Sequence, residues 1–249
     1  GKIMLKEIIT NIVWALGLIA GVPFFFIWLL SRLNRNTKQH IANRFGINSQ
    51  LYFGFLGIMI HELSHLIVAM IFGHRITGFR LISLPTNSNP TLGYVNHRWN
   101  QANFYQNIGN LFIGIAPIFG CCLATLALAK CLIPNSYTWL LEFTQLPLSV
   151  DLQLSPDFHW QGLLLFIILA ANICIGGFDL SPADFQNARQ GLWQAIITII
   201  ILSLLISFTP WQATLFTELR RLTIIITAIS IFNLILSGTF NLIFRSLSS

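Results

Sequence analysis

Long apolar runs divide this chain and restrict what it can fold into. Crossing the hydrocarbon core of a membrane as a helix takes about 20 apolar residues. Five runs approach or exceed that length, over residues 8–30, 51–73, 104–129, 192–208 and 222–244, and a shorter sixth run covers 162–177. Of the 249 residues, 55% are hydrophobic and 9% are charged, against about 25% charged in soluble domains. We therefore expect an all-α polytopic membrane protein of about six transmembrane helices, with residues 1–249 forming a single membrane domain.

The charge bears on the expected partners, and the cysteines bear on possible redox or zinc sites. The net charge of +6 is spread over several loops and forms no basic stripe, so the lipid bilayer is an expected partner and nucleic acid is not. The four cysteines lie within or at the ends of apolar runs and have no CxxC spacing. They are typical of small packing residues rather than a redox or zinc set.

A polar loop follows the second apolar run, over residues 74–100. Two runs containing Thr, Ile, Leu and Val flank the turn-forming stretch "PTNSNP", a pattern that predicts a β-hairpin. His74 and His97 flank this hairpin, and we interpret both as interfacial side chains.

The second apolar run contains the motif "HELSH", which carries His61, Glu62 and His65. On a helix, the i, i+4 spacing places both imidazoles on one face, where they can hold one zinc ion. In HExxH sites of peptidases the glutamate serves as general base. Chance gives roughly 0.002 such matches in a chain of this composition. The alternative is a buried polar network between helices, but ionisable groups inside a span usually mark a functional site.

Catalytic zinc usually has three protein ligands, so the motif needs one more. No third histidine follows at metzincin spacing, and the glutamates after the motif, Glu142 and Glu218, lie outside the apolar runs. Two aspartates in "GGFDLSPADF", Asp179 and Asp184, are better candidates. "SPAD" also reads as a helix start with Asp184 at the third position, which would need no metal.

These features together resemble the site-2 protease family of intramembrane zinc metalloproteases. The shared features are HExxH inside a span, a hairpin-like loop, a third span with Gly and Pro, and a late aspartate after a broken helix. The family's third ligand lies in a motif of Asn followed by Pro-x-Asp-Gly. Here Asn172 precedes "PADF", in which Phe185 stands where the family has glycine. The resemblance covers residues 51–192.

The resemblance implies one Zn²⁺ ion, held by His61, His65 and Asp184, with Glu62 as the catalytic base. It implies a multi-pass protein of a bacterial cell membrane that cuts a membrane-anchored protein or peptide in or near its transmembrane segment. The strand over 91–97 would hold the substrate extended by β-augmentation, although an ordinary connecting hairpin explains it equally well. The expected substrate-binding residues are Thr91, Gly93, Tyr94, Val95, Asn96, Asn110 and Asn172, of which the last two are equally plausible in helix-to-helix hydrogen bonds.

Two other functions stay open at this point. A membrane zinc protease of the CAAX prenyl protease type would take a glutamate as its third ligand. A non-catalytic metal-binding membrane protein would need no general base. A site near the middle of its span also predicts a polar cavity that admits water to His61 and His65.

Overall fold

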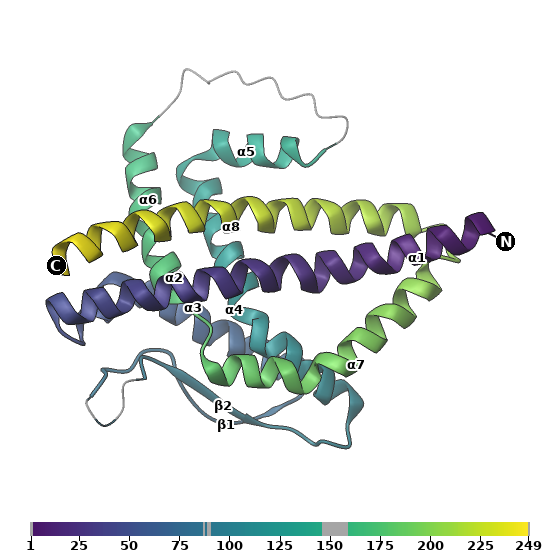
Figure 1. Cartoon of the computed structure of the whole chain (residues 1–249), viewed down its shortest axis with the longest axis horizontal. Coiled ribbons are helices and arrows are strands. Elements are labelled where there is room, and N and C mark those ends of the chain that lie inside the picture. Colours follow the sequence, from purple (N-terminus) through teal and green to yellow (C-terminus); the bar gives the residue numbers. More distant parts are fainter. Residues whose placement is uncertain (1, 87, 89–90, 146–158, 249) are drawn as a thin grey trace.

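The computed structural model describes residues 2–86, 88, 91–145 and 159–248 (Figure 1). This part of the chain is mostly helical, with a two-stranded antiparallel sheet after α3. Five of its helices are long and apolar enough to cross a membrane: α3 (Ser49–Ile71), α4 (Phe104–Leu132), α6 (Trp160–Gly177), α7 (Pro182–Ile206) and α8 (Gln212–Ser248). The expected polytopic helical membrane protein is confirmed.

The first expected span is not one of these five candidates. Residues 2–45 are helical but divided into α1 (Lys2–Leu16), a π-helical turn, η1 (Gly17–Gly21), and α2 (Val22–Phe45). α1 has only 15 residues, too few for the hydrocarbon core. The second half of α2 carries Arg35, Lys38 and Arg44, so it is too polar to lie in the hydrocarbon core. The apolar run over 8–30 therefore lies across a helix boundary, because glycines at both ends of η1 permit a change of helix type.

α1 and α2 lie alongside α8 and run in the same direction (Figure 1). Polar side chains join α2 to α8: Ser237 donates a hydrogen bond to Asn34 Oδ1, and Asn241 Nδ2 donates to Asn36 Oδ1 at 2.7 Å. Asn34 also donates to the carbonyl of Cys174 in α6 at 2.8 Å. Because Asn34 and Ser237 are fully buried, these bonds fix the register of the two helices.

α3 packs closely against α6 through glycines. A Cβ at Gly57 would lie 2.5 Å from the Gly177 nitrogen and 2.6 Å from the Ile173 oxygen, and a Cβ at Gly54 would lie 2.8 Å from the Gly176 Cα. Small residues allow helix backbones in membranes to approach in this way. The contact places the carbonyl oxygens at the end of α6 beside the middle of α3.

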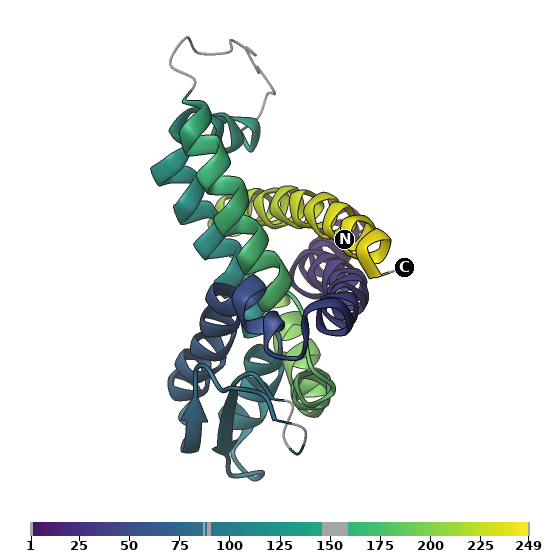
Figure 2. The same ribbon diagram turned by 90° about the vertical axis from the view of Figure 1, so that its left-hand side faces the viewer.

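The predicted hairpin is confirmed. β1 (Arg75–Arg80) pairs antiparallel with β2 (Tyr94–Arg98), with Ile76 opposite His97, and the register shifts between Ile76 and Gly78. Figure 2 shows the strands at one end of the molecule, beside α7.

A short helix, α5 (Pro134–Phe143), follows α4 at the opposite end of the molecule from the hairpin (Figures 1 and 2).

Candidate metal centre

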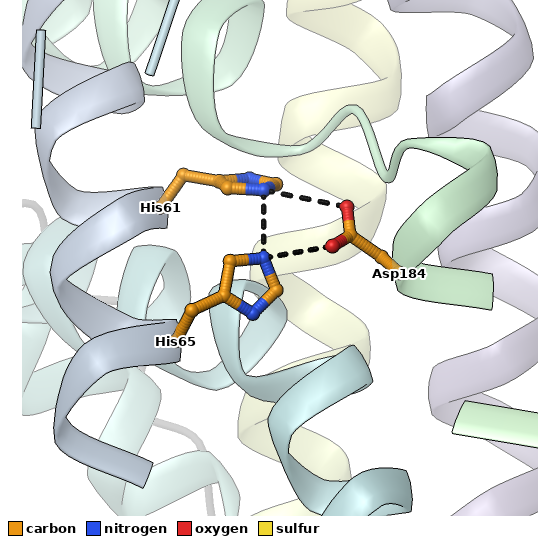
Figure 3. A group of neighbouring side chains, drawn as sticks. All are labelled: His61, His65 and Asp184. Atoms are coloured by element: carbon orange, nitrogen blue, oxygen red, sulfur yellow. Dashed lines mark hydrogen bonds and ion pairs between the residues drawn. The ribbon is translucent and has the colours of Figure 1, made fainter. Parts of the chain in front are cut away.

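His61 and His65 project from one face of α3, with their Nε2 atoms 3.1 Å apart (Figure 3). Both side chains are buried. The remaining ring nitrogens contact main-chain oxygens: His61 Nδ1 lies 2.9 Å from the Gly177 oxygen in α6, and His65 Nδ1 lies 2.7 Å from the Ile113 oxygen in α4. Because a carbonyl only accepts hydrogen bonds, each Nδ1 carries the proton. In a neutral ring, Nε2 then carries a lone pair that can bind a cation.

Asp184 approaches the two histidines from the first turn of α7 (Figure 3). Its Oδ1 lies 3.0 Å from His65 Nε2, and its Oδ2 lies 3.6 Å from His61 Nε2. Ser181 caps the helix, as the sequence predicts, and Pro182 occupies its first turn. The Ser181 N–H donates to Asp184 Oδ2 at 2.7 Å, and the Asp184 N–H donates to Ser181 Oγ at 3.2 Å.

The three side chains together form a buried group that can hold a metal ion. One ligand atom from each lies within 4.8 Å of those of the other two. With neutral rings, two nitrogen lone pairs and a carboxylate converge on the same point. Such an arrangement of acceptors is stabilised by a cation, and main-chain partners on the far ring nitrogens are typical of metal-ligating histidines.

Asp179, the other candidate ligand, lies outside this group. Its Oδ2 is 3.2 Å from Lys38 Nζ, and its Oδ1 is 3.6 Å from an Arg35 guanidinium nitrogen. Glu218 accepts a hydrogen bond from Arg221 at 3.0 Å, and neither it nor Glu142 joins a metal-holding group among the described residues. Of the four acidic candidates, only Asp184 is close to the histidines.

A cavity of about 760 Å³ opens onto the group and provides the predicted polar access. Glu62 lines this cavity with His61, His65 and Asp184. The segment of the hairpin that contains β2 forms another wall, and it includes five predicted substrate-binding residues: Thr91, Gly93, Tyr94, Val95 and Asn96. Gly93 lies close to Glu62, since a Cβ at Gly93 would be 2.7 Å from Glu62 Cγ.

Asn110 and Asn172, the other two expected substrate-binding residues, are not among the lining residues. Asn172 Oδ1 accepts from the Leu56 N–H at 2.8 Å, and its Nδ2 donates to the Tyr52 oxygen at 3.2 Å. Asn172 therefore joins α6 to the main chain of α3. This is the helix-to-helix hydrogen bonding that the sequence offers as the alternative to substrate binding. Asn110 is fully buried within α4. Neither side chain lines the cavity that holds Glu62 and the histidines.

Two lining residues, His97 and Asn187, are not predicted by the sequence as site residues. Asn187 lies one turn after Asp184, a spacing that could have identified it. His97 lies in β2, and its Nδ1 is 2.9 Å from His74 Nδ1. Burial, reinforced by His74 and then His65, lowers the pKa of His97 to about 4. Burial also lowers the pKa of His74, so both rings are neutral at pH 7.

Comparison with known proteins does not assign this chain to a family. No protein-family model, curated protein or solved structure matches it.

Proposed function

We propose that this protein is a zinc endopeptidase that hydrolyses a peptide bond in or near a transmembrane segment of a membrane-anchored substrate. One observation carries the proposal: Glu62 and three converging ligand atoms open into the same cavity as an extended strand. These are the parts that peptide hydrolysis needs. The ligands hold the metal, the carboxylate moves protons, and the strand orients the backbone to be cut.

The ligand set fits zinc. Two imidazoles and one carboxylate are typical of a catalytic zinc site that keeps a position for water. Tetrahedral zinc with ligand distances of about 2.0 to 2.1 Å separates its ligand atoms by about 3.3 Å. The separations here are 3.0, 3.1 and 3.6 Å.

Glu62 is the proposed general base. It follows His61 directly on α3 and lines the cavity beside the ligand group. Bound zinc would supply Lewis-acid activation of water at neutral pH. The Glu62 carboxylate accepts a proton from the attacking water and passes it to the leaving amine.

The substrate is proposed to bind as a strand. A peptide bond in a helix is protected by its own hydrogen bonds and side chains, so the substrate must be extended before it is cut. β2 pairs with β1 on one side and forms a wall of the cavity on the other. An extended peptide can add to such a strand edge through main-chain hydrogen bonds.

The first experiment measures zinc stoichiometry in purified protein. Asp184→Ala is expected to lose zinc, because it removes one of three ligands. Asp179→Ala is the matched control, since Asp179 pairs with Lys38 and Arg35 instead, and it should retain one ion per chain. Full zinc retention in Asp184→Ala would contradict the ligand assignment.

The second experiment separates catalysis from binding alone. The probe is a labelled single-span peptide whose transmembrane segment contains a Gly-Pro break. Glu62→Gln is expected to keep zinc and to lose cleavage of this peptide. A parent protein that binds zinc and does not cleave would support the non-catalytic alternative. The CAAX prenyl protease alternative has less support, because the candidate glutamate Glu218 pairs with Arg221.

A further inference from the structure

A second histidine pair lies at the edge of the cavity, outside the metal centre. His74 follows α3 and His97 lies in β2, and their Nδ1 atoms are 2.9 Å apart. On its far side, His74 Nε2 lies 2.8 Å from the Gln106 oxygen. The Trp99 ring stacks on His74, with ring centroids 5.8 Å apart. The pair is therefore fixed between the hairpin and the start of α4.

The hydrogen bonds of this pair have one possible direction when both rings are neutral. The Gln106 carbonyl only accepts, so His74 Nε2 carries the proton and His74 Nδ1 is an acceptor. His97 Nδ1 must then donate to His74. His97 Nε2 is consequently left as an acceptor, on the side of the ring that faces α7.

Asn187 meets that acceptor. Its Nδ2 lies 3.4 Å from His97 Nε2, and the residue lines the cavity one turn after Asp184. Because His97 Nε2 accepts, Asn187 must turn its NH₂ group toward the ring. The opposite orientation would place the amide oxygen against a nitrogen lone pair. This contact favours one orientation of the Asn187 amide, and within the described part of the chain its second N–H and its oxygen can bond elsewhere.

We propose that Asn187 is a substrate-binding residue that hydrogen bonds to the extended peptide backbone between β2 and α7, and that His97 and His74 are positioning residues that orient its amide. This inference rests on the proposed peptidase function and adds the element that contacts the substrate opposite β2. A peptide backbone presents both N–H and C=O groups, and a fixed amide offers the complementary acceptor and donor. Prior orientation of the amide reduces the entropy cost of binding.

The test measures binding and cleavage of the single-span Gly-Pro peptide in detergent. In the zinc-loaded Glu62→Gln protein, Asn187→Ala is expected to weaken peptide binding at least tenfold. With Glu62 intact, Asn187→Ala is expected to lower kcat/KM to a similar extent without changing zinc stoichiometry. Gln186→Ala is the matched control, because the preceding side chain is exposed and does not line the cavity, and it should match the parent.

The positioning role of His97 is tested by two isosteres. A Gln side chain can place an oxygen acceptor where His97 Nε2 lies, whereas Asn reaches only the Nδ1 position. His97→Gln is therefore expected to keep more of the parent kcat/KM than His97→Asn, with equal zinc content in both. Equal loss in both variants would overturn the positioning role.

The failure of this inference is distinguishable from the failure of the proposed function. If Glu62→Gln abolishes cleavage and Asn187→Ala leaves binding and cleavage unchanged, the inference is overturned and the peptidase stands. If the zinc-loaded parent does not cleave the peptide, both are overturned.

Discussion

Ser181 and Asp184 hydrogen bond to each other in both directions at the start of α7, and the same Asp184 carboxylate faces the two histidines. The sequence presents helix capping and metal ligation as alternatives for Asp184. In the structure they are compatible, because one carboxylate oxygen accepts the Ser181 N–H while the other lies beside His65. The helix start therefore orients the candidate ligand.

Ser181→Ala is expected to weaken zinc binding about tenfold, because partners that orient metal ligands typically contribute 10- to 100-fold in affinity. Loss of the cap should also cost about 1 kcal/mol of stability. A competition titration with a chromophoric chelator measures the affinity. Ser181→Thr keeps a capping hydroxyl and should remain close to the parent. Equal affinity in all three proteins would show that the cap does not orient Asp184.

Gly93→Ala is expected to impair cleavage while zinc stays bound. The new methyl group would lie 2.7 Å from Glu62 Cγ and 3.0 Å from the Leu81 oxygen, so either Glu62 or the hairpin must move. We expect kcat to fall at least tenfold on the single-span peptide. Gly78→Ala in β1 is the control, since its nearest atom is an ordinary contact at 3.8 Å. Normal turnover in Gly93→Ala would contradict the close contact between the hairpin at Gly93 and the side chain of Glu62.

Gly57→Ala is expected to destabilise the protein and to weaken zinc binding together. A Cβ there meets main-chain atoms of α6, which cannot rotate away, and overpacking of this kind costs about 1 to 3 kcal/mol. Displacement of α6 would also move the Gly177 oxygen away from His61. Thermal unfolding and zinc titration in detergent measure both effects. Gly238→Ala, with nothing within 4 Å, should change neither, and a Gly57→Ala protein with parental affinity would refute the link.

Acid is expected to destabilise the protein through His97. Its pKa is lowered from 6.5 to about 4 in the folded state, mainly by burial. Well above pH 6.5 the ring is neutral in both states and contributes no pH dependence. As the pH falls from 6.5 toward 4, the unfolded chain binds a proton that the folded protein excludes, so stability falls. Thermal unfolding is measured for the metal-free parent and for His97→Asn across this pH range. The stability of the variant should fall less than that of the parent as the pH is lowered. Identical pH dependence would exclude the ring as the cause.

Local patterns in the sequence predict several parts of this structure. The HELSH spacing places His61 and His65 on one helix face, the polar turn between two strand-like runs predicts the hairpin, and "SPAD" predicts the start of α7. Each of these patterns lies within one short segment of the sequence, of fewer than 30 residues. Five of the six expected spans also correspond to helices that can cross a membrane.

Contacts between distant segments are not predictable in the same way. Asn172 bonds to Tyr52, 120 residues earlier, and Asn187 meets His97, 90 residues earlier. Nothing next to these asparagines indicates whether they face a cavity or another helix. The division of the first apolar run at η1 is also not predictable from hydropathy, because the residues are apolar on both sides of the change in helix type.

Main-chain oxygens of α4 and α6 hold the far ring nitrogens of both histidines. A side-chain substitution does not remove a main-chain carbonyl. The orientation of each imidazole ring therefore depends on the position of the neighbouring helix. The geometry of the metal centre therefore depends on how α4 and α6 pack against α3. A displacement of α6 against α3 would draw the Gly177 oxygen away from His61 and change the direction in which the His61 ring points.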